Sequence, residues 1–384
     1  MKKYCIFAIP AFISMSAIAQ SSVTLYGLID EGIGYTNNAS GKSSWNTQNG
    51  WVAGDRWGLL GSEDLGGGMK AIFRLETGFL LDNGRSLVSG EMFARQSYVG
   101  LQSDTLGTLT FGRQYDTVAD MIGPLTMNGS YAGWPFSHPF DNDNTDDTFR
   151  VNNSVKYLSP RFNGLQFSGL YGFSNQAGGF ANNRAFSAGI TYTTGALDLG
   201  AAYFQANNGG ANQGGAMPGL NGVGAYGDVN FIAKRQRVYG AGAKYTFNSV
   251  ALGVVYTHSS FDDPVSSIYT GPFGASAQSL KFDNFEVNAK YQFNPALFAV
   301  AMYTFTRGHY SAGATNAKPD WNQGALMLNY SLSRRTSVYT QVAYQHVSGG
   351  TTGTGLDNAF VLGAAGPSST RSQVLTRIGL FHTF

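Results

Sequence analysis

Polar and apolar residues alternate along many stretches of this chain, and residues 282–293 show the pattern most clearly. Successive side chains of a β-strand point to opposite faces, so positions of one parity share a face. The stretch therefore predicts a strand with one polar and one apolar face. Its polar positions are Asn284, Glu286, Asn288, Lys290 and Gln292, and its apolar positions are Phe285, Val287, Ala289, Tyr291 and Phe293.

Sixteen segments of the chain read as strands of this kind. Many run for 10–14 residues, which is longer than the usual strand of about 5–6 residues and enough to cross a bilayer when tilted. The segments are 22–36, 51–62, 69–80, 93–104, 106–114, 151–159, 162–174, 184–195, 196–207, 234–247, 250–261, 279–293, 297–308, 319–332, 335–347 and 371–384.

The connections between these segments alternate between short turns and long loops. Seven turns are short, whereas eight loops are long, polar and rich in Gly and Asn. An up-and-down barrel of the outer-membrane type has this asymmetry, with short periplasmic turns and longer extracellular loops. The long loops are 37–50, 81–92, 115–150, 175–183, 208–233, 262–278, 309–318 and 348–370.

The composition agrees with a barrel that crosses a membrane. Only 12% of residues are charged, about half the soluble average, and 14% are aromatic, which excludes a disordered chain. No apolar run of about 20 residues follows residue 30, which excludes a helical membrane bundle. In lipid a sheet pairs all its backbone groups only by closing. We therefore predict an all-β, 16-stranded antiparallel transmembrane barrel, with its apolar faces toward lipid and its polar faces around water.

The first residues predict a cleaved signal peptide. Lys2 and Lys3 precede an apolar stretch that ends in the small-residue pattern of 17–19. We expect residues 1–19 to be removed and residues 20–384 to form the barrel. The one cysteine, Cys5, lies in the removed part, so no disulfide or thiolate metal site is expected. Cleavage leaves 23 basic and 23 acidic residues, which gives no basic surface for nucleic acid.

Several motifs together resemble one known family, the general trimeric porins of Gram-negative bacteria, and especially their betaproteobacterial branch. The resemblance implies an outer-membrane homotrimer in contact with lipid and lipopolysaccharide. It also implies passive diffusion of small hydrophilic solutes and ions, and a third long loop folded into the lumen. The matching residues are 22–27 (SVTLYG), 56–59 (RWGL), 61–66 (GSEDLG), 93–101 (FARQSYVGL), 109–113 (LTFGR), 152–157 (NNSVKY) and 382–384 (HTF).

The third loop, residues 115–150, is also the longest connection, and it contains six aspartates but only one basic residue, Arg150. A barrel of sixteen strands encloses an aqueous channel, which a loop folded inside would narrow. Carboxylates on the loop that face arginines on the wall would create a transverse field that selects solutes by charge. We therefore expect this loop to form the pore constriction.

Wall arginines at a porin constriction correspond by motif to Arg56, Arg95 and Arg150 of this chain. Arginine suits this role because its charge persists at all relevant pH values. Arg74 and Lys70 share an inward parity with Glu76 and are expected to tune the wall.

On the loop, Asp116 and Asp120 are the expected acidic partners, while residues 141–147 are expected to be surface-exposed. The loop departs from the enterobacterial porins, because Gly-Pro-Leu at 123–125 replaces their Pro-Glu-Phe-Gly. Three arginines against two acids predict a mild preference for anions.

The parity of the fourth predicted strand raises one difficulty. If Arg95 points inward, Gln96 and Gln102 point outward, which is a poor surface for lipid. We interpret this as a sign that a subunit interface covers Gln96.

Two other functions stay open at this stage. Trp134 and Tyr131 would form a sugar slide in a substrate-specific channel, for a sugar or an organic anion, or the lumen would be plugged in a purely structural barrel. The five histidines show no metal-ligand spacing, and no nucleophile elbow is present. The acidic stretch 141–147 lacks the glycine and the final glutamate of a calcium loop. We expect no cofactor, no metal and no catalysis.

Overall fold

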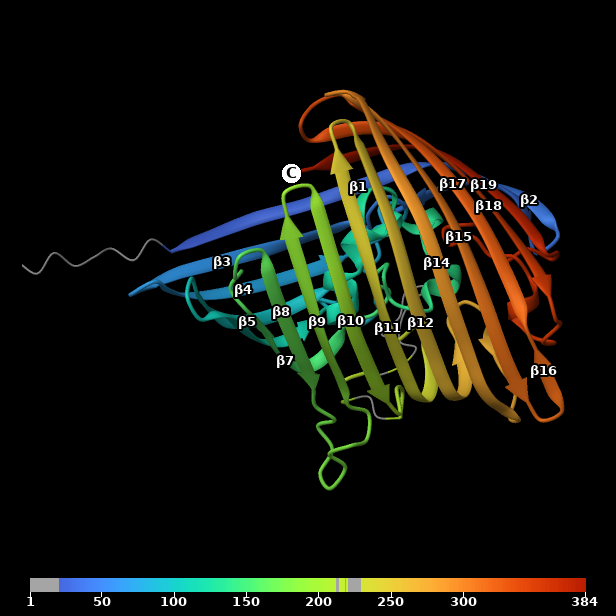
Figure 1. Cartoon of the computed structure of the whole chain (residues 1–384), viewed down its shortest axis with the longest axis horizontal. Helices are drawn as coiled ribbons and strands as arrows, with labels where there is room; N and C mark the ends of the chain where they lie inside the picture. Colours follow the sequence, from blue (N-terminus) through green and yellow to red (C-terminus); the bar gives the residue numbers. More distant parts are fainter. Residues whose placement is uncertain (1–20, 212–213, 218, 220–228) are drawn as a thin grey trace, which may run out of the picture.

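The computed structural model describes residues 21–211, 214–217, 219 and 229–384. The described strands form one antiparallel sheet in which the first strand pairs with the last, so the sheet closes on itself (Figure 1). Ile33 of the first strand lies opposite Ile378 of the last. The predicted signal peptide, residues 1–19, lies outside the described residues and stays a prediction.

The described strands are numbered β1 to β19. Their bounds are β1 Ser22–Ala39, β2 Lys42–Asn49, β3 Arg56–Gly66, β4 Met69–Gly78, β5 Gln96–Ser103, β6 Gly107–Gln114, β7 Val151–Leu158, β8 Leu165–Gly172, β9 Ala185–Thr194, β10 Leu197–Asn207, β11 Phe231–Phe247, β12 Val250–Ser267, β13 Gly271–Pro272, β14 Ala277–Asn294, β15 Leu297–Ala312, β16 Thr315–Ala317, β17 Pro319–Ser331, β18 Thr336–Gly349 and β19 Ser372–Thr383.

Sixteen of these strands close the barrel, which confirms the predicted fold class. The short strands β2, β13 and β16 pair with the C-terminal parts of β1, β12 and β15. Three predicted long loops, 37–50, 262–278 and 309–318, are therefore largely strand. The alternating pattern weakens there because both faces of a strand that has left the membrane meet water, and polar residues are then tolerated on either face.

The alternating residues of β14 lie on opposite faces of the barrel wall, as the sequence predicts. Its polar positions Asn284, Glu286 and Asn288 are buried inside the barrel, whereas Phe285 and Val287 are about half exposed on the outer face. The outer face of the sheet is thus the apolar one, as a wall in contact with lipid requires.

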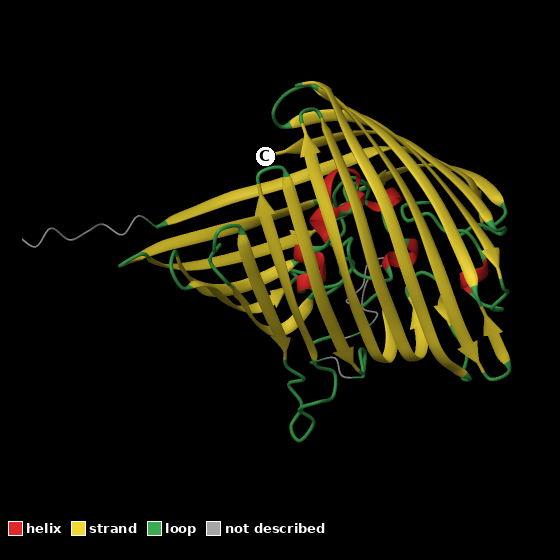
Figure 2. Cartoon of the chain, viewed as in Figure 1, coloured by secondary structure: helices red, strands yellow, loops and turns green. Residues whose placement is uncertain are grey.

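Residues 115–150 lie inside the ring of strands (Figure 2). They contain helix α1, Thr117–Met121, and four short helical turns at Gly123–Leu125, Asn128–Ala132, Trp134–Phe136 and Pro139–Asp141. One further short turn, Gly355–Asp357, belongs to the last long loop. None of the helices in the described ranges has the length and apolarity needed to cross a membrane.

Side-chain amides of the wall hold the loop by its carbonyl groups. Gln323 donates to the carbonyl oxygens of Pro135 and Ser137 at 3.1 and 3.0 Å, and Gln341 donates to that of Ala132 at 2.7 Å. Backbone groups removed from water need such partners. The polar inner face of the wall therefore both lines the lumen and satisfies the loop that narrows it.

Candidate functional site: a constriction in the lumen

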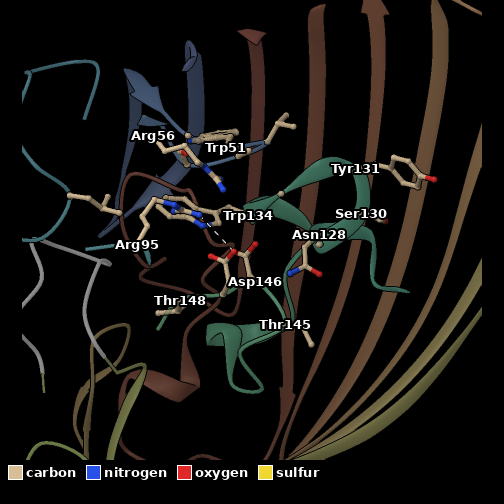
Figure 3. A pocket seen from close by; sticks show the side chains of 18 of the residues that line it. Trp51, Arg56, Arg95, Asn128, Ser130, Tyr131, Trp134, Thr145, Asp146 and Thr148 are labelled. Carbon is tan, nitrogen blue, oxygen red and sulfur yellow. Dashed lines mark hydrogen bonds and ion pairs between the residues drawn. The ribbon is translucent and has the colours of Figure 1, made fainter. Parts of the chain in front are cut away.

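A cavity of about 370 Å³ opens between the loop and the wall (Figure 3). Three arginines, Arg56, Arg95 and Arg150, contribute to its lining from the wall side. The loop contributes Asn128, Tyr131, Trp134 and the carboxylates of Asp146 and Asp147. Trp51 and Tyr269, which lie outside the loop, also line the cavity.

Arg95 immediately precedes β5, and its side chain is only 4% exposed. Its Nε donates to Oε1 of Glu76 at 3.0 Å, and its Nη2 donates to the hydroxyl of Tyr115 at 2.9 Å. Glu76 also accepts a hydrogen bond from the Tyr26 hydroxyl at 2.7 Å. A charge so far removed from water is stable only when it is paired and hydrogen-bonded, and these contacts fix the guanidinium at the edge of the cavity.

Arg150 meets Arg95 at the same tyrosine. Its Nη2 donates to the Tyr115 hydroxyl at 2.8 Å and pairs with Asp147 at 3.0 Å, and its guanidinium lies 4.7 Å from the centre of the Tyr115 ring. Arg56 begins β3, and its Nε donates to the carbonyl oxygen of Gly54 at 2.8 Å. Tyr115 thus holds two of the three predicted arginines side by side.

Asp116 does not face the pore. Its carboxylate is fully buried and caps α1, where it accepts hydrogen bonds from the backbone N–H groups of Val118 and Ala119 at 2.7 and 3.4 Å. Asn144 donates to its other oxygen at 2.7 Å. Burial raises the pKa of Asp116 to about 6. The expectation of a pore-facing carboxylate at this position fails because the helix that starts at Thr117 needs an N-cap.

Asp120 is exposed to the lumen but does not line the cavity with the arginines. It lies on α1 and forms an ion pair with Lys156 of β7. The acidic residues at the cavity are instead Asp146 and Asp147, and Asp147 lies 3.8 Å from Arg95. The predicted opposition of Asp120 and Arg95 is replaced by one between Asp147 and both Arg95 and Arg150.

Lys70 and Arg74 lie on the inner face of β4, as their parity with Glu76 predicts. The Arg74 guanidinium lies 5.4 Å from the centre of the Tyr26 ring. Lys70 is exposed and is the second residue of β4, close to the turn that joins β3 to β4. Neither residue lines the cavity.

The expected outward position of Gln96 is wrong. Gln96 is buried and lies opposite Glu76 in the register of β4 and β5, while Val99 and Leu101 are exposed on the outer face. The strand β5 begins at Gln96, so the alternation of faces applies from Gln96 onward and does not determine which way Arg95 points. Both Arg95 and Gln96 therefore face inward, and Gln96 gives no indication of a subunit interface.

The acidic stretch 141–147 is largely buried, contrary to the expectation that it is surface-exposed. The imidazole of His138 lies between the carboxylates of Asp143 and Glu286, at 2.6 and 3.0 Å. Asp141 accepts hydrogen bonds from the backbone N–H groups of Asp146 and Thr148. Within the part of the chain that the structure describes, no three His, Cys, Asp or Glu side chains are arranged to hold a metal ion.

Burial alone would lower the pKa of His138, but the two carboxylates outweigh it and raise the pKa to about 10. The imidazole is therefore charged at neutral pH and links the loop to β14 through Glu286. Asn284 and Thr257 of the wall add hydrogen bonds to the same group of loop side chains, which includes Asn142 and Asp143.

The constriction residues predicted from the sequence do not include Tyr115, Asp146 and Asp147. Asp147 and Arg150 are three residues apart at the end of the loop, and Tyr115 is the residue with which the loop begins. The two ends of a loop that connects neighbouring strands must lie close together. That constraint alone would have placed Tyr115 beside Arg150.

A closed barrel with a polar lumen and a loop that narrows it to a charged opening defines a membrane channel. The model of the Gram-negative porin family matches residues 7–350. An outer membrane porin protein of Bordetella pertussis is 32% identical over 377 residues, which cover 86% of this chain and 90% of the relative. Outer membrane porin protein 32 of Delftia acidovorans is 29% identical over the full length of both chains. This chain therefore belongs to the Gram-negative porin family.

A solved structure agrees on the fold. The anion-selective porin from Comamonas acidovorans superposes with a TM-score of 0.71 at 23% identity, covering 95% of this chain and all of that one. The protein is thus an outer-membrane porin, in which a water-filled barrel allows small hydrophilic solutes and ions to diffuse across the membrane.

Proposed function

We propose that this porin is a general diffusion channel with a mild preference for anions, set by Arg56, Arg95 and Arg150. The observation that carries the proposal is the gathering of these three guanidinium groups around one cavity in the lumen. Fixed positive charges at a narrow, partly dry passage raise the local concentration of anions and repel cations. Arg74 and Lys70 add positive charge to the wall away from the cavity.

The carboxylates near the cavity compensate for only part of this charge. Glu76 is bound to Arg95, and Asp147 is shared between Arg95 and Arg150. Burial, together with the carboxylates of Asp141 and Asp147, raises the pKa of Asp146 well above its usual range. These causes disfavour the charged form of Asp146. The excess of positive charge is small, which supports a mild preference rather than strict anion selectivity.

A substrate-specific channel for an organic anion is the second candidate. Trp134 lines the same cavity as the arginines, and its backbone N–H donates to the carbonyl of Trp51 at 2.8 Å. An aromatic surface beside guanidinium groups suits a solute with a carboxylate and an apolar body. Small conductance steps blocked by one such solute would favour this candidate, whereas large ohmic steps without saturation favour general diffusion.

We also propose a homotrimer embedded among outer-membrane lipid and lipopolysaccharide. One of the structural neighbours, OmpT of Vibrio cholerae, is described in a trimer form (TM-score 0.64, 16% identity). Val23, Leu25 and Val99 leave the outer face of the early strands exposed and apolar, which suits a subunit contact or lipid. Lys281 and Arg307 carry positive charge on the outer face toward the long-loop ends of β14 and β15, where lipopolysaccharide phosphates would lie. We also propose that this porin catalyses no reaction.

The proposal is tested by the reversal potential in a potassium chloride gradient across a planar bilayer. Replacing Arg56, Arg95 and Arg150 by Gln should lower the anion-to-cation permeability ratio by about twofold or more. A control removes three arginines outside the cavity, Arg307, Arg334 and Arg335, and should leave the ratio near that of the wild type. Equal ratios for the two triple variants would refute the assignment.

A further inference from the structure

Two lysines of the wall, Lys244 of β11 and Lys290 of β14, flank one aromatic ring of the constriction loop. The Nζ of Lys290 lies 4.2 Å from the centre of the Tyr131 ring and 4.5 Å from that of Phe298. The Nζ of Lys244 lies 6.0 Å from the same Tyr131 ring and donates to the carbonyl oxygen of Pro124 at 2.9 Å. The two ammonium groups thus share one small region of the structure.

Both lysines lie on the inner face of the barrel. A Cβ added at Gly242, two residues before Lys244, would lie 3.1 Å from Leu125 of the loop. Asn288, two residues before Lys290, donates to the carbonyl oxygen of Leu125 at 3.0 Å. Because residues two apart in a strand share a face, Lys244 and Lys290 point toward the loop and the lumen.

The lysines lie toward the opposite end of the barrel from the arginines. Lys244 is three residues from the end of β11 and Lys290 is four residues from the end of β14, and both strands end in short turns. Arg56 begins β3, and Arg95 and Arg150 immediately precede β5 and β7, at the long-loop ends of these strands. A solute that passes the loop therefore meets the arginines on one side and the lysines on the other.

Asp198 supplies a carboxylate in the neighbourhood of this lysine pair. Among the described residues, neither ammonium group forms an ion pair with a carboxylate. Asp198 lies opposite Lys244 in the register of β10 and β11, and its carboxylate accepts a hydrogen bond from the Thr193 hydroxyl at 2.9 Å. An aromatic face orients a cation but supplies no net charge. The lysines therefore keep donors and positive charge for a solute.

We propose that Lys244 and Lys290, held at the Tyr131 ring, form a second anion-binding station on the short-turn side of the constriction. The ligand class is the small oxyanion, a phosphate or a carboxylate, because its several oxygens can accept charge-assisted hydrogen bonds from two ammonium groups. The inference rests on the proposed anion preference and extends it. An anion that leaves the arginines then binds at a second positive site before it reaches the short-turn end of the barrel.

The experiment measures how inorganic phosphate inhibits the chloride current of single channels in a planar bilayer. In the wild type we expect a saturable inhibition. Lys290→Gln and the double variant Lys244→Gln/Lys290→Gln should raise the phosphate concentration for half-inhibition by about threefold or more. Lys281→Gln is the matched control, because it removes the same charge from the outer face of the same strand.

A charge-preserving variant guards against loss of folding. Lys244→Arg/Lys290→Arg should inhibit like the wild type, because the positive charges and donors remain. The inference is overturned if the double glutamine variant and Lys281→Gln give the same half-inhibition, or if inhibition does not saturate in the wild type. An anion-preferring wild type combined with either result would remove the lysine station alone, whereas a cation-preferring wild type would also remove the proposed function.

Discussion

At the scale of single residues, the constriction contains arginines that keep their charge although their side chains are almost fully buried. Arg95 and Arg150 are only 4% and 5% exposed, and both donate to the hydroxyl of Tyr115. Arginine tolerates such a position because its fork of donors can be satisfied by neutral oxygens as well as by carboxylates. The hydroxyl holds the two guanidinium groups in place without cancelling the charge on which the proposed anion preference depends.

The two aspartates of the cavity should differ in their effect on selectivity. Asp147→Asn removes a carboxylate shared by Arg95 and Arg150 and should raise the anion-to-cation permeability ratio by about twofold. Asp146→Asn, the matched control, should change the ratio less, because burial and the neighbouring carboxylates of Asp141 and Asp147 raise the pKa of Asp146 and disfavour its charged form. Reversal potentials measure both. A larger effect of Asp146→Asn would contradict this distribution of charge between the two carboxyl groups.

Gly133 should be irreplaceable where the loop turns toward Trp134. Its φ is 67°, and an added Cβ would lie 1.8 Å from the carbonyl oxygen of Trp51. Gly133→Ala should lower the free energy of unfolding by about 1–3 kcal/mol and alter the single-channel conductance. Gly324→Ala is the control, because its Cβ would meet only the Met302 carbonyl at 4.0 Å. Thermal melting in detergent compares the two, and equal melting temperatures would contradict the strain at Gly133.

At the scale of elements, the loop is attached to the wall by a buried ionic group of three residues. Protonated His138 lies between Asp143 of the loop and Glu286 of β14, and all three are fully or almost fully buried. Burial raises the pKa of Asp143, but His138 outweighs burial and lowers it below its usual value. Removing one member leaves a buried charge unpaired, which costs about 3–5 kcal/mol. The position of the constriction thus depends on the charge of one imidazole.

This attachment predicts a pH range for the constriction. The raised pKa of His138 contributes stability that is complete below its usual value of 6.5 and lost as pH rises through about 10. The lowered pKa of Asp143 contributes stability that is present above 3.8 and lost as pH falls through the lowered value. The attachment through His138 and Asp143 should therefore persist from about pH 5 to 9, and single-channel conductance should change as it is lost above about pH 10.

His138→Gln should produce the altered conductance already at pH 7. His346→Gln is the control, because His346 lies on the outer face of β18 and bonds only to the hydroxyl of Ser372 at 2.8 Å among the described contacts. If His138→Gln kept the wild-type conductance at pH 7, the attachment through this imidazole would be excluded.

The strands were predictable from the sequence, whereas the path of the loop was not. In β14 a period of two residues assigns each side chain to a face, because water lies on one side and lipid on the other. No such period governs residues 115–150, which are bounded by the wall alone. Asp116 and Asp147 look alike in the sequence, yet one caps a helix and the other pairs with arginines. Arg95 shows the same limit, since alternation fails one residue before the strand begins.

At the scale of the whole molecule, closure of the sheet makes the channel possible. β1 pairs with both β3 and β19, so the ring formed by the described strands leaves no open edge toward lipid, and their polar faces point to one lumen. The family model shows that this architecture belongs to a porin. We propose that the residues of the constriction decide which solutes pass.

The most direct test of this account is the single-channel current of the purified protein in a planar bilayer under a potassium chloride gradient. The account predicts stepwise, ohmic conductance and a reversal potential displaced toward that of chloride. Absence of conductance steps would contradict an open lumen, and a reversal potential displaced toward that of potassium would contradict selection by the arginines.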